Sequence, residues 1–372
     1  MKLLVVIVNY RTASLAIDCL RSLAPEIAQI SGGVRVVVTD NLSGDDSVPR
    51  LEKAIADNHW ADWASVLPLP SNGGFAYGNN MGIRPGLESA DKPDFVLLLN
   101  PDTVLRAGAV TELLRFMESR PDVGIAGSRL EDPDGTPQVS AFRFHSIFSE
   151  FEHGIRLGPV SKALAKHRVA PPAPNETCRT DWVCGASMMI RREVFEKIGL
   201  LDERYFMYYE ETDFCLKAKR AGFPCWYVPS SRVIHLVGSA SQLSDARKHR
   251  KRRPAYWFES RRRYFVENHG RIYALLADAS YATAYAIWRL RRFVQRKPDT
   301  DPPKFLWDFV RHAGWGRGAV PVGQAFLPAS GQRPESSEVT DRGCAARQTG
   351  MSAPPISPRP AVDGGASSFP RR

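Results

Sequence analysis

Two stretches of the sequence place a side chain that can bind a metal directly after an apolar run. In "FVLLLNPDT", the strand-like residues 95–99 are followed at once by Asn100, Pro101 and Asp102. His235 ends a second β-like run, "PSSRVIH". Asp102 alone can be explained as a cap for a following helix, and a single histidine is usually structural. A carboxylate and an imidazole together would form a site suited to Mg²⁺ or Mn²⁺.

A third stretch, "YYEETD", places three carboxylates within four residues, after an aromatic segment. They belong to Glu210, Glu211 and Asp213, at the start of an expected helix. Acidic residues in a first helical turn complement the helix dipole, which is the structural explanation. Carboxylates among aromatic side chains can also be tuned for general-base catalysis. Both explanations stay open from the sequence.

The elements that must position these residues follow a regular alternation in the first half of the chain. We expect strands at 3–8, 34–39, 64–67, 95–99 and 123–126, and helices at 13–23, 48–57 and 107–120, with a further helix opened by 72–83. This alternation predicts an α/β fold with a mostly parallel sheet and flanking helices. Ligands of such sheets bind beyond the carboxyl ends of the strands, where Asn9, Asp40 and Asp102 fall. Asp40 alone can be a turn former.

The connection after the first expected strand, "NYRTAS", argues against two other enzyme classes. A dinucleotide-binding domain needs a glycine-rich turn there, and this turn has no glycine. A nucleotidyltransferase would need a glycine-rich loop bearing Lys or Arg, and only Arg11 is present. The nucleotidyltransferase stays as an alternative, together with a non-catalytic glycan- or membrane-binding module.

Composition sets outer limits on the class of protein. The 372 residues, 43% of them hydrophobic, suit one large domain or two. The six cysteines form no C-x-x-C pair, so neither a zinc ribbon nor a disulfide scaffold is indicated, and a reducing cytosol suits them. The apolar runs are too short for an ordinary membrane span, which needs about 18 residues.

The net charge of +10 is concentrated toward the C-terminus. Residues 244–317 contain 18 Lys and Arg against 7 Asp and Glu, and basic runs flank the apolar-aromatic residues 272–288. Nucleic acid is not an expected partner, because no nucleic-acid-binding signature accompanies these runs. The two open interpretations are an in-plane helix on an anionic membrane surface and a solvated helical hairpin. From residue 318 the Pro, Gly, Ser and Ala content predicts disorder.

Seven motifs in order resemble the family 2 glycosyltransferases of the GT-A fold, in their rhamnosyltransferase-like branch, over roughly residues 3–240. They are "VIVNY", "TDNLSGD", "NGGFAYGNN", "LLLNPDT", "WVCGASMMIRR", "EETDFCLKAKRAGF" and "VIH". The organisation that follows is a GT-A catalytic domain at 1–243, a basic aromatic helical extension at 244–317 and a disordered tail at 318–372.

The resemblance implies an inverting, metal-dependent transfer of a sugar, with rhamnose suggested by the branch. The donor would be a dTDP- or UDP-sugar, and the acceptor a glycan or lipid-linked glycan of cell-surface polysaccharide synthesis. The expected location is cytoplasmic, peripheral on the inner face of the cell membrane.

The resemblance also assigns roles to individual residues. The residues that would bind the donor are Asn9, Asp40, Asn72, Gly73, Asn100 and Asp102, and the metal ligands would be Asp102 and His235. The residues on the acceptor side would be Trp182, Gly185 and Ala186. The catalytic base would be Glu211, with Glu210 and Asp213 as alternatives. Trp182 can equally be a core residue. The chain departs from the family at Asn100, where an aspartate is common, and at Glu210-Glu211, where a Glu-Asp pair is frequent.

Overall fold

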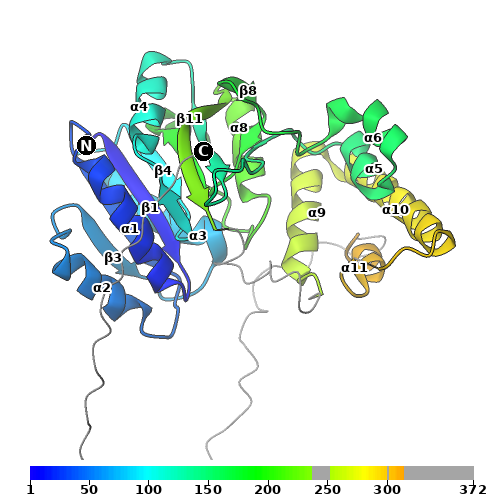
Figure 1. Cartoon of the computed structure of the whole chain (residues 1–372), viewed down its shortest axis with the longest axis horizontal. Helices are drawn as coiled ribbons and strands as arrows, with labels where there is room; N and C mark the ends of the chain where they lie inside the picture. Colours follow the sequence, from blue (N-terminus) through cyan, green and yellow to red (C-terminus); the bar gives the residue numbers. More distant parts are fainter. Residues whose placement is uncertain (237–251, 300, 314–372) are drawn as a thin grey trace, which may run out of the picture. The chain divides into compact units, whose positions relative to one another are not determined.

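The computed structural model describes residues 1–236, 252–299 and 301–313 (Figure 1). All of these residues belong to one compact unit. The expected disordered tail and the expected boundary at 243/244 lie outside the described residues.

A nine-stranded sheet forms the centre of the described part of the chain. Its order is β3-β2-β1-β4-β10-β6-β11-β5, with β8 also paired to β11. The strands are β1 (Leu3–Asn9), β2 (Val34–Asp40), β3 (Ala64–Pro68), β4 (Phe95–Leu99), β5 (Thr103–Leu105), β6 (Ile125–Glu131), β8 (Cys178–Thr180), β10 (Ser187–Arg191) and β11 (Cys225–His235). Strands β3, β2, β1 and β4 are parallel neighbours, as are β6 and β11. The expected mostly parallel α/β fold is confirmed.

Helices cover both faces of this sheet. They are α1 (Ala13–Ile27), α2 (Ser47–Asp57), α3 (Gly74–Glu88), α4 (Ala109–Ser119), α7 (Arg192–Ile198) and α8 (Glu210–Arg220). Alternate residues of β1 enter different cores: Leu3 packs with α1, α2 and α4, and Leu4 packs with α3, α7 and α8. Burial on both faces explains why the strands read as continuous apolar runs.

Two features differ from the simple alternation of strands and helices. Strand β10 runs antiparallel between β4 and β6. Helix α4 begins at Ala109 after Gly108, whose φ of +83° requires the left-handed region that favours glycine. Asp102 is therefore not the cap of this helix, and Thr103 opens the short strand β5 instead.

The described part of the basic C-terminal segment, residues 252–299 and 301–313, is largely helical. It contains α9 (Ala255–His269), α10 (Arg271–Val294) and α11 (Phe305–His312). Helices α5 (Ile147–Ile155) and α6 (Gly158–Ala163) also belong to this region, where α5 packs along α10 (Figure 1). None of the helices in the described ranges combines the length and hydropathy needed to cross a membrane.

Candidate active site

The candidate site begins at the carboxyl ends of β1 and β4. Strand order reverses between these two strands, which is where open α/β sheets bind ligands. Asn9 is the last residue of β1 and lies beside Asp40 at the end of β2. Asn100 and Asp102 follow β4 directly. The polar strand ends expected from the sequence therefore share one edge of the sheet.

Asp40 is held by hydrogen bonds from its own turn and from Asn9. Its Oδ1 accepts from Asn9 Nδ2 at 2.7 Å and from Ser43 Oγ at 2.5 Å, and its Oδ2 accepts from Ser43 N at 2.9 Å. The carboxylate is 3% exposed. Asp40 thus does form a turn, but a carboxylate offers about four acceptor positions, so these three bonds leave capacity for a ligand.

The start of α3 is fixed by close backbone contacts. Gly73 is its N-cap, and Asn72 Oδ1 accepts from Gly74 N at 3.1 Å. Phe75 N donates to Phe206 O at 2.9 Å. A Cβ on Gly74, whose φ is +86°, would lie 1.8 Å from Phe206 O. Only glycine fits here, and the contact joins α3 to the segment that leads into α8.

Asp102 and His235 are brought together by the pairing of β5 with β11. His235 Nε2 lies 3.5 Å from Asp102 Oδ1, and Leu236 N donates to Asp102 O at 2.9 Å. Within residues 1–236, 252–299 and 301–313, no group of three His, Cys, Asp or Glu forms a complete metal cage. Mg²⁺ and similar cations are commonly held by one or two protein ligands plus substrate phosphates, so the pair fits a cation shared with a diphosphate.

The carboxylates of α8 follow a strained piece of backbone. Tyr208 and Tyr209 have φ of +71° and +69°. Large side chains rarely adopt this left-handed conformation, and strain of this kind gathers at functional sites. The two residues turn the chain so that Glu210 and Glu211 open the helix.

Glu210 and Glu211 are adjacent carboxyl groups whose pKa values are both raised. Burial raises the pKa of Glu210 well above its usual value, and the negative charge of Glu211 raises it further. Burial also raises the pKa of Glu211, but hydrogen bonds from Glu210 and from the Gly185 N–H oppose this shift. Glu210 is buried whereas Glu211 is half-buried. Glu211 is therefore the member that ionises more readily, although its Oε2 atom is buried like that of Glu210.

Asp213 faces a different part of the molecule. Its Oδ2 lies 2.6 Å from Lys217 Nζ, and its Oδ1 accepts from Asn268 Nδ2 at 2.6 Å. Asn268 belongs to α9, so this carboxylate holds α8 against that helix.

The turn at Cys184 lies near both Asp102 and the glutamate pair. Burial raises the pKa of the Cys184 thiol to about 12, and the charges of Glu211 and Asp102 act in the same direction. Both carboxylates therefore lie near this thiol. Asn100 N donates to Ala186 O at 3.0 Å, which fixes the end of β4 against the same turn. The position of Cys184 near both carboxylates was not predicted from the sequence, although the residue lies inside the motif "WVCGAS".

Gly185 and Trp182, which were predicted to lie on the acceptor side, have different surroundings. A Cβ on Gly185 would lie 2.9 Å from the Phe75 ring, so the start of α3 also packs on this turn. Trp182 stacks on Phe142, with ring centroids 4.1 Å apart, and its Nε1 donates to Arg143 O at 3.0 Å. One face of the Trp182 ring is thus used for packing between β9 (Trp182–Val183) and β7 (Ala141–Phe142).

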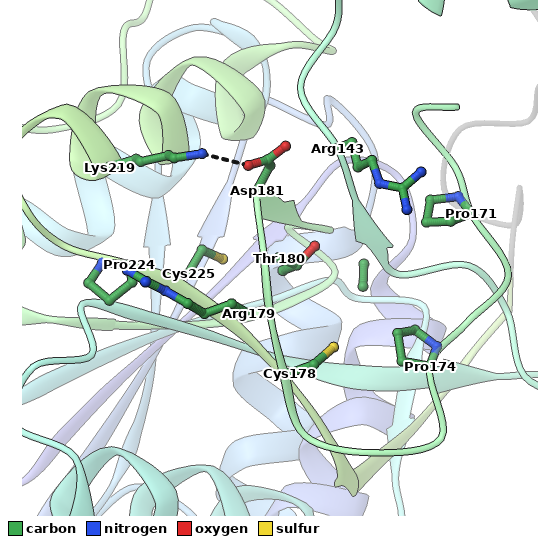
Figure 2. A pocket seen from close by; sticks show the side chains of 11 residues that line it. Arg143, Pro171, Pro174, Cys178, Arg179, Thr180, Asp181, Lys219, Pro224 and Cys225 are labelled. Atoms are coloured by element: carbon green, nitrogen blue, oxygen red, sulfur yellow. Dashed lines mark hydrogen bonds and ion pairs between the residues drawn. The ribbon is translucent and has the colours of Figure 1, made fainter. Parts of the chain in front are cut away.

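A separate cavity of about 510 Å³ lies near the other end of α8 (Figure 2). Its lining residues are Ala141, Arg143, Pro171, Pro174, Cys178, Arg179, Thr180, Asp181, Lys219, Pro224 and Cys225. Lys219 Nζ lies 2.8 Å from Asp181 Oδ1. Cys225 begins β11 whereas His235 ends it, so the cavity and the Asp102–His235 pair lie toward opposite ends of that strand.

Comparisons with known proteins show the family and the fold of this chain. A family model described as "Glycosyltransferase like family 2" matches residues 2–256. The chain is 30% identical over 189 residues to N-acetylglucosaminyl-diphospho-decaprenol L-rhamnosyltransferase of Mycobacterium tuberculosis, covering 46% of this chain and 59% of that protein. It is 32% identical over 218 residues to the low-salt glycan biosynthesis hexosyltransferase Agl10 of Haloferax volcanii, covering 58% of this chain and 61% of the relative. The chain thus spans about three-fifths of the length of these relatives.

A solved structure shares the fold. It is the mannosyltransferase PcManGT from Pyrobaculum calidifontis in complex with GDP-Man and Mn²⁺, with a TM-score of 0.52 at 13% identity. The match covers 84% of this chain and 86% of that one.

Proposed function

The chain belongs to the glycosyltransferase-like family 2 and has the GT-A fold, and from that premise we propose that it transfers a sugar from a nucleotide-sugar to an acceptor hydroxyl. The proposed donor is a dTDP- or UDP-sugar, with rhamnose as the sugar. The proposed acceptor is a glycan or lipid-linked glycan of cell-surface polysaccharide synthesis. The M. tuberculosis relative supports this choice, since its name joins L-rhamnosyl transfer to a diphospho-decaprenol.

One observation carries the proposal: Glu211 and the Asp102–His235 pair lie around the turn at Cys184. A cation ligand and a base near one turn are the two groups that displacement of a nucleoside diphosphate requires. The nucleotidyltransferase alternative gains no support, because Arg11 Nε donates to Ser43 O at 2.8 Å within the β2 turn.

On the donor side, Asn9 and Asp40 would contact the base and ribose, with Asp40 accepting from the pyrimidine N–H. The α3 start at Gly73 is available to the ribose or diphosphate, because a helix N-terminus favours anions. Asp102 and His235 would hold Mg²⁺ or Mn²⁺. When bound, this cation would neutralise the negative charge that develops on the departing diphosphate.

On the acceptor side, Glu211 would take the proton of the attacking hydroxyl. The hydroxyl oxygen forms its bond to the anomeric carbon as the bond from that carbon to the diphosphate oxygen breaks, and the configuration inverts. Glu210, which keeps its proton, supports the charged form of Glu211. The turn that contains Gly185 and Ala186 would border the acceptor sugar, together with Trp182.

The remaining parts of the proposal concern organisation and location. We keep the division into a catalytic domain at 1–243, a basic helical extension at 244–317 and a disordered tail at 318–372. A cytoplasmic location, peripheral on an anionic membrane surface, would bring the enzyme to a lipid-linked acceptor.

A thermal-shift panel of nucleotide-sugars, with and without Mn²⁺, tests the proposal. We expect one nucleotide family to raise the melting temperature, more strongly with Mn²⁺, because a ligand that binds only the folded state stabilises it by mass action. Asp102→Asn should lose the Mn²⁺-dependent part of the shift, whereas the exposed Asp57→Asn should keep it. A panel in which no nucleotide-sugar changes the melting temperature would contradict the proposal.

A further inference from the structure

The outward face of α10 is apolar along its whole length. Its exposed large hydrophobic residues are Ile272, Leu275, Leu276, Ile287, Leu290, Phe293 and Val294. At 100° per residue they fall within an arc about 120° wide. The other residues of that arc are Ala279, Thr283 and Ala286, so the arc contains no charged residue. We call these ten residues the outer stripe.

The outer stripe is not needed to build the helical extension. The opposite side of α10 packs inward through small and aromatic residues, among them Ala277, Tyr281 and Tyr285. A helix that is solvated on its outer side normally carries polar residues there. The exposure of Ile272 at 78% and Phe293 at 79% therefore indicates a surface meant to meet an apolar partner.

Helix α11 adds to the same apolar character. Trp307 is 67% exposed and Val310 is 47% exposed. Among the described residues, the other exposed large hydrophobics are scattered over the rest of the fold: Tyr10, Leu42, Val139 and Phe148. The concentration of apolar exposure on α10 and α11 is thus a local property.

Positive charge surrounds the stripe. Residues 252–313 contain 13 Lys and Arg against 6 Asp and Glu. Arg271 begins α10, while Arg296 and Lys297 follow its end, and all three are exposed. An apolar face with basic residues at its ends is the pattern of helices that lie in the interface of anionic membranes.

A second copy of this chain is the less suitable occupant. A symmetric contact through the stripe would bring the same basic ends of two molecules together, and like charges oppose such a contact. We propose that the outer stripe, with Trp307 and Val310, lies in the headgroup region of an anionic lipid bilayer, with α10 parallel to the membrane plane. The purpose of this contact rests on the proposed function, since it would hold the catalytic site near a lipid-linked acceptor.

Vesicle co-sedimentation of the full chain tests this surface. We expect binding to vesicles of mixed phosphatidylcholine and phosphatidylglycerol, weaker binding at high ionic strength, and little binding to pure phosphatidylcholine. The double variant Leu276→Glu, Leu290→Glu should bind at least roughly tenfold more weakly, because two apolar side chains no longer enter the interface. Leu42→Glu is the matched control, since Leu42 is 54% exposed and Leu276 is 53% exposed.

Several outcomes would overturn the membrane surface. The first is that the double variant binds anionic vesicles as strongly as wild type, and the second is that wild type binds neutral vesicles equally well. The third is that wild type does not bind vesicles but forms a dimer in solution, and that the double substitution makes the protein monomeric. The donor-dependent thermal shift should be the same in wild type and double variant. If vesicles bind through the stripe but no nucleotide-sugar shifts the melting temperature, the proposed function fails and the membrane surface stands.

Discussion

At the residue scale, the chemistry of the site depends on two adjacent glutamates that cannot both ionise easily. We predict that Glu211→Gln lowers the turnover rate by about 10² to 10⁴, the usual contribution of a general base, while the donor-induced thermal shift persists. Glu210→Gln is the matched control and should cost less than about tenfold, because Glu211 can still accept the proton. Equal losses in both variants would contradict the assignment.

The pH dependence follows from the same pair. The pKa of Glu211 is raised above its ordinary value of 4.5, and the base acts only when ionised. The rate should therefore rise with pH through this raised pKa. In Glu211→Gln the rising limb should disappear from the pH profile of the residual rate.

Some residues of the candidate site could be predicted from the sequence and others could not, because their roles depend on different contacts. Asp102 and His235 could be paired in advance because both end β-like runs, and the structure brings them together. The choice between Glu211 and Asp213 could not be made, because it depends on Asn268, which is 55 positions further along the chain. Sequence spacing does not show such a contact.

At the scale of elements, strands β1 to β4 and their helices follow from the local pattern of apolar residues. The antiparallel direction of β10 does not, because "SMMIR" is equally apolar in either direction and its neighbours are set by tertiary packing. Likewise, the start of α4 shifts to Ala109 because Gly108 adopts a left-handed conformation.

The join between α3 and the segment before α8 gives a sharper test at this scale. We predict that Gly74→Ala lowers the free energy of unfolding by about 3 kcal/mol or more, because it adds a steric clash to backbone strain. Gly108→Ala is the control: φ is +83° there, in the left-handed region, and nothing lies within 4 Å of an added Cβ. It should cost about 1–2 kcal/mol from strain alone. Urea unfolding measures both, and equal costs would contradict the role of the Phe206 contact.

At the scale of the whole described molecule, the helical extension supports the segment that carries the glutamates. Ser260 Oγ in α9 donates to Met207 O at 3.0 Å, and Arg204 pairs with Glu267 at 2.6 Å. The extension is itself fixed by Arg261, which pairs with Glu150 of α5 at 2.7 Å and with Asp278 of α10. One buried cation thus ties three helices together.

Arg261 therefore gives a prediction about global stability. All three side chains are buried, so Arg261→Met leaves two carboxylates without their cation and should lower the free energy of unfolding by about 3–5 kcal/mol at neutral pH. The control Arg289→Met breaks a pair with Asp299, whose side chain is 43% exposed. It should cost no more than about 1 kcal/mol.

The effect of acid on these variants separates the charge of Arg261 from its packing. Burial alone would raise the pKa of Glu150, but attraction to Arg261 and the hydrogen bond with His145 outweigh it and lower this pKa to about 2. A carboxyl whose pKa is lowered by folding stabilises the protein above its unfolded pKa of 4.5, and this contribution is lost as pH falls from there toward 2. Arg261→Met lacks this contribution at every pH, so the difference in the free energy of unfolding between wild type and variant should narrow as pH falls from 4.5 toward 2. Unfolding series at neutral and acidic pH would show this narrowing, whereas a gap independent of pH would assign the loss to packing.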